Sequence, residues 1–240
     1  MSARSEAAED KLSNYYFLTR TFLYINKRLY RDAIQRFADD LSGLVVDVGC
    51  GQAPYRPLLT RARKYAGIDA VSNSRADILA DAQRLPVADN GVDSILCTEV
   101  LEHVVDPDAV MIEAVRVLRP GGALLVTAPM SWNLHYEPTD YRRYTCYGLW
   151  QLLESHGFQV VETRRIGGLF SLVGSRLVDG VGSELYRRLE PLPPRIRHAV
   201  VLCYSIPMSL LFSFFARIGD RFESTDAIGW AVLATKAEPE

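Results

Sequence analysis

A short apolar segment rich in valine, residues 44–48, runs directly into Gly49-Cys50-Gly51. This pattern predicts a buried parallel strand and a tight turn, where glycines and nearby helix N–H groups let the backbone approach a ligand closely. Asp69 ends the next apolar segment about twenty residues later, where a carboxylate can accept both hydroxyls of a ribose. The third glycine of the dinucleotide pattern is absent, and Pro54 stands where its helix would begin, which disfavours NAD. A turn that serves packing alone, with Asp69 as an ordinary turn residue, is the alternative.

A second concentration of reactive side chains lies in residues 135–145, HYEPTDYRRYT, directly after a predicted strand. Ligands of open α/β sheets bind beyond the carboxyl ends of the strands, so we expect this loop to hold a substrate. His135 has the most suitable intrinsic pKa for a general base, and Asp140 could orient it or replace it. Two structural alternatives are a salt-bridged loop clasp of Asp140 with Arg142 or Arg143, and a His135 that has no chemical role.

The elements that must position these residues alternate between strand and helix. Strands are predicted at residues 44–48, 65–68, 94–98, 123–128 and 159–165. Asp106-Pro107 predicts the start of a helix that runs to about Leu118 and is stopped by residues 120–122, and Thr145 predicts the N-cap of a helix over residues 145–156. This order predicts a parallel, doubly wound sheet. A helical stretch of residues 168–220 then delays the last strand, residues 230–235.

Residues 44–128 resemble the class I S-adenosylmethionine-dependent methyltransferases, in particular their type 11 branch. Four motifs carry the resemblance in family order: VVDVGCG at 45–51, GIDA at 67–70, ADAQRLPVADNGVDSILCTEVLEHV at 80–104 and RVLRPGG at 116–122. The loop at 135–145 is similar to one found in methyltransferases of glycan and cell-envelope pathways. Several ordered motifs at family spacing are more specific than any one of them.

The resemblance implies a role for eight residues in binding S-adenosylmethionine. It implies that Asp47, Gly49 and Gly51 hold the methionine portion and Asp69 the ribose, that Asp81 and Ala82 contact the adenine, and that Glu99 and Leu101 line the methionine end. Only eleven residues separate Asp69 from Asp81, where the family usually has a crossover helix, so this connection must be abbreviated. We interpret Glu102-His103 as a structural pair at the start of a helix rather than as a catalytic one.

Composition limits the remaining choices. Hydrophobic residues make up 48% of the 240 residues and the net charge is −2, so the chain is globular and has no global attraction to nucleic acid. The four cysteines are scattered and form no Cys/His cluster, which predicts neither a zinc site nor a disulfide framework and fits the cytoplasm. The polar, acidic segment 1–11 does not have the pattern of a secretory signal.

One late segment raises the question of a membrane. Residues 199–216 contain no charge and reach the lower limit of a membrane-spanning length. A span would separate two strands of one sheet, and Ser205, Ser209 and Ser213 form a small-residue stripe suited to close helix packing. We therefore expect a helical hairpin that packs on the domain. Its apolar residues would cover the acceptor side, face a partner subunit or touch a membrane surface: Leu210, Leu211, Phe214 and Phe215.

These observations predict a Rossmann-like, doubly wound, seven-stranded mixed sheet whose last strand is antiparallel. We expect a disordered tail at 1–13 and a single methyltransferase domain at 14–240, with an N-terminal helical cap at 14–41 and a helical insertion at about 168–220. Its predicted activity is metal-free methyl transfer from S-adenosylmethionine, at oxygen, to a small-molecule or glycan-type acceptor. A non-catalytic cofactor-binding scaffold or assembly protein is the alternative from another class.

Overall fold

The computed structural model describes residues 25–222 and 225–238. The chain divides into two compact units, an α/β unit of Arg31–Ile166 with Ile228–Glu240, and a helical unit of Gly167–Ala227 with the N-terminal residues as far as Tyr30. The predicted tail at 1–13 and the first part of the predicted N-terminal cap lie outside the described residues. The division does not test the prediction of a single domain.

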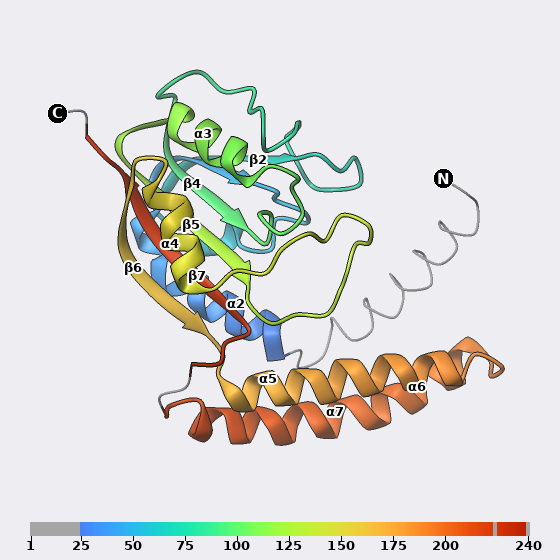
Figure 1. Ribbon diagram of the computed structural model, residues 1–240. Coiled ribbons are helices and arrows are strands. Elements are labelled where there is room, and N and C mark those ends of the chain that lie inside the picture. Colours follow the sequence, from blue (N-terminus) through green and yellow to red (C-terminus); the bar gives the residue numbers. More distant parts are fainter. Residues whose placement is uncertain (1–24, 223–224, 239–240) are drawn as a thin grey trace. The chain divides into compact units, whose positions relative to one another are not determined.

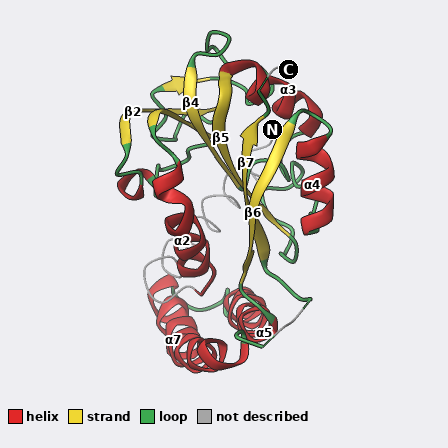
Figure 2. Cartoon of the chain, turned by 90° about the vertical axis from the view of Figure 1, so that its left-hand side faces the viewer, coloured by secondary structure: helices red, strands yellow, loops and turns green. Residues whose placement is uncertain are grey.

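The α/β unit is built on a seven-stranded sheet, most of whose strands are labelled in Figures 1 and 2. The strand order is β3-β2-β1-β4-β5-β7-β6, and β7 runs antiparallel to both of its neighbours while the pairs from β3 to β5 are parallel. The predicted mixed sheet is therefore confirmed. The strands are β1 Gly43–Val48, β2 Ala62–Asp69, β3 Ile78–Leu79, β4 Val92–Thr98, β5 Leu118–Pro129, β6 Phe158–Ile166 and β7 Gly229–Lys236.

Helices flank this sheet, and two of them begin at the predicted N-caps. The helices of this part of the chain are α2 Ile25–Phe37, the 3-10 turns η1 Ala38–Asp40 and η2 Arg56–Leu58, α3 Pro107–Val117 and α4 Cys146–Glu154. The Asp106 carboxylate accepts from the backbone N–H of Ala109 at 3.1 Å, and the Thr145 hydroxyl accepts from that of Gly148 at 3.1 Å. Both predicted N-caps are confirmed.

Near the glycine turn, one expectation was wrong and another is confirmed. No regular α-helix follows the turn, only the 3-10 turn η2, so the expectation of nearby helix N–H groups was wrong. The reason is local: Ala53 has a φ of 51°, and Pro54 and Pro57 remove two backbone donors. Residues 70–91 hold the short strand β3 and no helix, which confirms the abbreviated connection between Asp69 and Asp81.

The core surrounds the middle strands. β1 lies between β2 and β4, and Asp47 is the single polar residue of its buried end, in register with Gly67 on β2 and Leu96 on β4. Val46, Val48 and Ile95 are at most 2% exposed. Burial on both faces explains the continuous apolar pattern of β1, and it fixes the turn after Val48 at the carboxyl end of the sheet.

The helical unit is the predicted hairpin. Helix α5 Leu169–Ser175, the π-helical segment η3 Arg176–Val181 and α6 Gly182–Arg188 form one arm, which lies beside the other arm, α7 Pro194–Gly219 (Figure 1). A Cβ added at Gly174 would lie 2.5 Å from Phe212 Cβ, so the arms approach closely at this glycine. The predicted small-residue stripe is buried on α7, namely Ser205, Ser209 and Ser213. The apolar residues that alternate with it, Leu210, Leu211, Phe214 and Phe215, are exposed.

Candidate active site

The glycine turn sits at the carboxyl end of β1. Gly49 and Gly51 have φ values of 69° and 53°, the left-handed region that favours glycine. A side chain at Gly49 would come within 2.2 Å of Val100 Cγ2, whereas a Cβ at Gly51 would meet nothing within 4 Å. The turn is thus closed against the core at Gly49 and open on the side of Gly51, which is the arrangement that lets a ligand reach the backbone.

Asp47 lies buried beneath this turn. Its Oδ2 accepts a hydrogen bond from the Tyr65 hydroxyl at 2.7 Å, and its buried Oδ1 has no hydrogen-bond partner among the described residues. Burial and, to a smaller extent, the nearby charge of Asp69 raise the pKa of Asp47 to about 7, although the hydrogen bond from Tyr65 lowers it. An unsatisfied buried oxygen costs the fold stability, so this atom is suited to a donor or a positive charge brought by a ligand.

Asp69 supports the turn directly. Its Oδ2 accepts from the Gly51 backbone N–H at 2.8 Å, and its Oδ1 accepts from the Val71 backbone N–H at 2.8 Å. A carboxylate has about four acceptor positions, so lone pairs are left for a ribose. Asp81 is exposed and its Oδ1 accepts from the Gln83 backbone N–H at 2.9 Å, while the neighbouring Ala82 packs against the core.

Glu99 extends the site from β1 to the end of β4. It has a φ of 55°, its backbone N–H donates to the carbonyl oxygen of Thr127, and its Oε1 accepts from the Thr127 hydroxyl at 3.2 Å. Burial first, and then the charges of Glu99 and Asp47, raise the pKa of the Tyr55 phenol, so Tyr55 belongs to the same group. Leu101, by contrast, is 0% exposed and packs in the core, so it offers a ligand no surface here.

Two of these residues, Tyr55 and Tyr65, were missed by the sequence analysis. A signal for Tyr65 was available, because Asp47 pairs in register with Gly67, and Tyr65 lies two residues before that glycine on the same face of β2. The glycine leaves room for the phenol to reach Asp47. Tyr55 follows Pro54 in an irregular segment, where no periodicity marks it.

The loop of residues 131–145 is held by a network around Asp140. Arg143 forms two hydrogen bonds to this carboxylate, at 2.6 and 2.8 Å, and the His135 backbone N–H donates a third at 3.0 Å. Arg142 donates to the carbonyl oxygens of Val104 and Val105, so the loop is fastened to the turn after β4. The loop-clasp geometry is confirmed, with Arg143 as the partner of Asp140.

Electrostatics separate the two candidate catalytic residues. The hydrogen bonds from Arg143 hold the pKa of Asp140 at about 2, so Asp140 is a carboxylate at neutral pH and a poor proton acceptor. Burial lowers the pKa of His135, which keeps its imidazole neutral and able to accept a proton. The geometry therefore favours Asp140 as an orienting group over Asp140 as a base.

The interpretation of Glu102-His103 as a helix-start pair was wrong. The helix α3 begins at Pro107, and Glu102 and His103 lie in the turn that precedes it. Tyr141 donates from its backbone N–H to the carbonyl oxygen of Glu102, which brings the 131–145 loop onto this turn. As a result, His103 Nε2 lies 3.1 Å from His135 Nε2.

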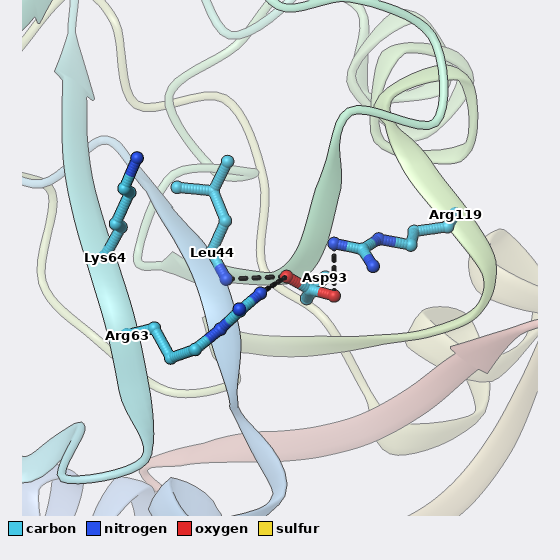
Figure 3. Close-up of a pocket in the computed structure, with 5 residues that line it drawn as sticks. All are labelled: Leu44, Arg63, Lys64, Asp93 and Arg119. Carbon is cyan, nitrogen blue, oxygen red and sulfur yellow. Dashed lines mark hydrogen bonds and ion pairs between the residues drawn. The ribbon is translucent and has the colours of Figure 1, made fainter.

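A hollow of about 410 Å³ lies at the opposite end of the strands (Figure 3). Its lining residues come from the amino-terminal ends of β1, β2, β4 and β5: Leu44, Arg63, Lys64, Asp93 and Arg119. Asp93 accepts from the Leu44 backbone N–H at 2.7 Å and pairs with both arginines. Since ligands of doubly wound sheets bind at the carboxyl ends, this hollow is separate from the predicted site.

The fold is a doubly wound α/β sheet with a glycine turn at the carboxyl end of β1, and comparison with known proteins shows what it is similar to. Residues 46–126 match the family described as "Methyltransferase domain". A protein of Mycolicibacterium smegmatis named "Probable S-adenosylmethionine-dependent methyltransferase" is 30% identical over 168 residues, 62% of each chain. "Methyltransferase GfsG" of Streptomyces halstedii is 33% identical over 120 residues, 42% of each chain. The chain thus spans less than two thirds of either relative.

A solved structure has a similar fold. The S-adenosylmethionine-dependent methyltransferase of Archaeoglobus fulgidus has a TM-score of 0.58 at 14% identity, and the match covers 92% of this chain and 99% of that chain. Residues 46–126 thus match a methyltransferase family model, and the seven-stranded sheet that contains them has the fold of solved methyltransferase structures.

Proposed function

We propose that this protein binds S-adenosylmethionine at the carboxyl ends of β1, β2 and β4 and methylates a hydroxyl of a small-molecule or glycan-type acceptor at the 131–145 loop. The observation that carries the proposal is the open turn at Gly51 above a buried Asp47 whose Oδ1 has no partner among the described residues. A ligand with a positive charge and an extended backbone-contacting part fits that combination. The family of residues 46–126 supports this cofactor.

The residues present fit the cofactor at two of its parts. The Asp47 carboxylate, with the backbone of Gly49 and Gly51, would hold the positively charged methionine portion, and Glu99 adds a second carboxylate nearby. Asp69 would accept from the ribose hydroxyls with the lone pairs that Gly51 and Val71 leave free. The contacts of Asp81 and Ala82 with adenine, and of Leu101 with the methionine end, are implied by the resemblance alone.

S-adenosylmethionine, when bound, supplies a methyl carbon that is already activated by a positively charged sulfur, so the protein mainly aligns the acceptor and excludes water. The acceptor hydroxyl must lose its proton, and we assign this step to His135 Nε2. Its Nδ1 lies 3.0 Å from the Asn133 carbonyl oxygen and 3.2 Å from Asp140, which fixes the proton on Nδ1. Asp140 thereby orients the imidazole with Nε2 as the accepting atom.

The experiment combines binding with turnover. Purified protein is titrated with S-adenosylhomocysteine in a calorimeter and then incubated with methyl-labelled cofactor and fractionated cell extract. We expect binding and transfer of label to a small or glycan-type product. Tight binding without transfer from any fraction would favour the non-catalytic scaffold, and absence of binding would refute the cofactor assignment itself.

Substitution of Asp140 tests its role separately. Asp140→Asn keeps the size of the side chain but weakens the charge-assisted bonds to Arg143. If Asp140 only orients His135, turnover falls less than in His135→Ala and the circular dichroism spectrum is unchanged. Loss of secondary structure in Asp140→Asn would instead give Asp140 a structural role alone.

We further propose, for the helical unit, contact with a second copy or with a lipid surface. The helix α7 is long and apolar enough to cross a membrane, with a mean hydropathy of 2.0 over 18 residues, of which 28% are buried. The strands on either side of the hairpin, β6 and β7, pair in one sheet, so a single crossing between them is not feasible. Its exposed face contains Leu210, Leu211, Phe214 and Phe215.

Flotation with anionic liposomes, together with light scattering in buffer, distinguishes these partners. Soluble protein that never floats and scatters as a dimer supports the second copy. Flotation supports a peripheral membrane contact. Extraction by detergent alone would overturn the argument against a span. That these helices cover the acceptor pocket stays a prediction.

A further inference from the structure

The side chains of Glu102, His103 and His135 lie close together beside the proposed acceptor site, but their mutual contacts do not meet all of their hydrogen-bonding requirements. Glu102 is 0% exposed, and neither of its carboxylate oxygens has a hydrogen-bond partner among the described residues. Its Oε1 lies 3.7 Å from His103 Nε2, which in turn lies 3.1 Å from His135 Nε2. One ligand atom from each of the three residues falls within 4.8 Å of the others.

Hydrogen bonds on the far side of each imidazole fix its protonation. His103 Nδ1 lies 2.7 Å from the Thr139 carbonyl oxygen, and a carbonyl can only accept, so this nitrogen carries the proton. His135 Nδ1 faces the Asn133 carbonyl oxygen and the Asp140 carboxylate and carries its proton for the same reason. In the neutral state, both Nε2 atoms therefore present lone pairs to each other.

Two lone pairs at 3.1 Å repel each other unless a proton or a metal ion lies between them. A proton shared by the imidazoles would satisfy the two nitrogens, but it would leave both oxygens of Glu102 without a hydrogen-bond partner. A metal ion can bind both nitrogens and one oxygen of Glu102 at the same time. Two histidine ligands of a tetrahedral ion, each at about 2.0–2.1 Å, lie about 3.3 Å apart, which is close to the separation found here.

We propose that Glu102, His103 and His135 form a binding site for one divalent first-row transition-metal ion of the Zn²⁺ type. Two imidazoles and one carboxylate are the donor set of such ions, and the Nδ1–H bonds to carbonyl and carboxylate oxygens are the outer contacts that orient ligand histidines. The side chains of His103 and His135 are 21% and 17% exposed, so the ion can enter from solvent. The Tyr136 ring lies 5.5 Å from both imidazole rings and shields them in part.

Three protein ligands leave at least one coordination position open, as in catalytic rather than structural zinc sites. The use of that position rests on the proposed function: an acceptor hydroxyl bound there would have a lowered pKa, and its proton would pass to solvent water. His135 would then act as a ligand, and as a base only in the metal-free protein. Binding of the ion itself does not depend on methyl transfer.

The test is a metal titration of the full-length protein after removal of metals with a chelator. Calorimetry with Zn²⁺ should show one equivalent bound, and Co²⁺ should give the visible absorption of a site with imidazole ligands. His103→Gln and Glu102→Gln should each weaken Zn²⁺ binding by at least about 10- to 100-fold, the range known for even the outer contacts of metal sites. His103 is partly exposed, so this variant is expected to fold if the buried Glu102→Gln does not.

The matched control is His156→Gln. His156 is 16% exposed and its Nε2 lies 3.4 Å from an Asp108 oxygen. It therefore resembles His103 in burial and in its neighbouring carboxylate, but it belongs to no cluster of three possible ligands among the described residues. It should bind Zn²⁺ as the unmodified protein does. No binding by the unmodified protein, or binding that survives His103→Gln and Glu102→Gln, would overturn the site. If either result is found while the protein still binds S-adenosylhomocysteine, the metal site is refuted and the proposed function is not. If the protein binds Zn²⁺ but not S-adenosylhomocysteine, the proposed function is refuted and the metal site is not.

Discussion

Replacement of Asp69 by alanine would remove the carboxylate that holds the glycine turn in place. Gly51 and Val71 both donate backbone hydrogen bonds of 2.8 Å to it, and its remaining lone pairs face the proposed ribose. The substitution therefore acts twice, on the ligand and on the turn that receives the ligand. The two effects differ in size and in the measurement that detects them.

The magnitudes follow from the charge and exposure of these groups. A hydrogen bond to a charged group contributes about 1.5–3 kcal/mol, so loss of the ribose contact weakens binding of S-adenosylhomocysteine by about 10- to 150-fold. The two freed N–H groups sit beside a half-buried residue, where water can replace the carboxylate, so the loss of unfolding free energy should stay near the low end of about 1–3 kcal/mol. Asp69→Asn keeps one acceptor oxygen and should lie between alanine and the unmodified protein.

Calorimetric titration with S-adenosylhomocysteine, paired with urea unfolding, separates these effects. Asp93→Ala is the control, because Asp93 also accepts a backbone hydrogen bond at the end of β1, from Leu44 at 2.7 Å, but at the opposite edge of the sheet. Asp93→Ala should lower the free energy of unfolding and leave the affinity for S-adenosylhomocysteine unchanged. Unchanged affinity in Asp69→Ala would remove Asp69 from the ribose site, and an equal loss in Asp93→Ala would show that stability alone explains the effect.

Three further predictions concern the remaining parts of the molecule. Because burial raises the pKa of Asp47 to about 7, unfolding free energy of the ligand-free protein should fall by up to about 4 kcal/mol as pH rises from 4 to 7, and Asp47→Asn should flatten this dependence in urea titrations. Affinity for S-adenosylhomocysteine should rise with pH over the same range, because the carboxylate form binds the positive methionine portion. His135→Ala should lower turnover by roughly 10²–10⁴-fold in the labelled-methyl assay with calorimetric affinity intact, and retained turnover would return His135 to a structural role. Gly174→Ala should cost about 1–3 kcal/mol in thermal unfolding, because its Cβ would lie 2.5 Å from Phe212 Cβ, whereas Gly180→Ala, with nothing within 4 Å, should be neutral or stabilising.

The sequence was informative wherever local chemistry determines the structure. Asp106 and Thr145 cap their helices as expected, because a capping side chain needs only the N–H groups three residues ahead. The strand β3 was missed for a physical reason. It consists of Ile78 and Leu79 alone, both exposed, and it exists because β2 offers an edge to pair with. No alternation or burial pattern can show a strand of that length.

The same distinction between local features and long-range contacts applies to the candidate site. The turn of Gly49 and Gly51 is local enough to be predicted, since the glycines need positive φ. The hydrogen bond by which Asp69 supports this turn was not predicted, because it joins residues 18 positions apart. The contact between His103 and His135 joins residues 32 positions apart. It depends on how the 131–145 loop closes over the turn after β4, and hydrogen bonds to backbone carbonyls fix that closure without any sequence motif.

Two carboxyl groups near the carboxyl ends of the strands lack the charge compensation that Asp93 has at the opposite ends, and this contrast supports the proposed location of the site. At the amino-terminal edge, Asp93 accepts from the Leu44 N–H and pairs with Arg63 and Arg119, so its charge is fully compensated within the chain. At the carboxyl edge, Asp47 and Glu102 are buried with oxygens that have no partner among the described residues, at a cost to stability. A ligand that binds only the native state stabilises that state by mass action, so ligand binding can offset the destabilisation caused by these buried oxygens. The proposed cofactor would supply a positive charge at Asp47, and the proposed metal ion would supply one at Glu102.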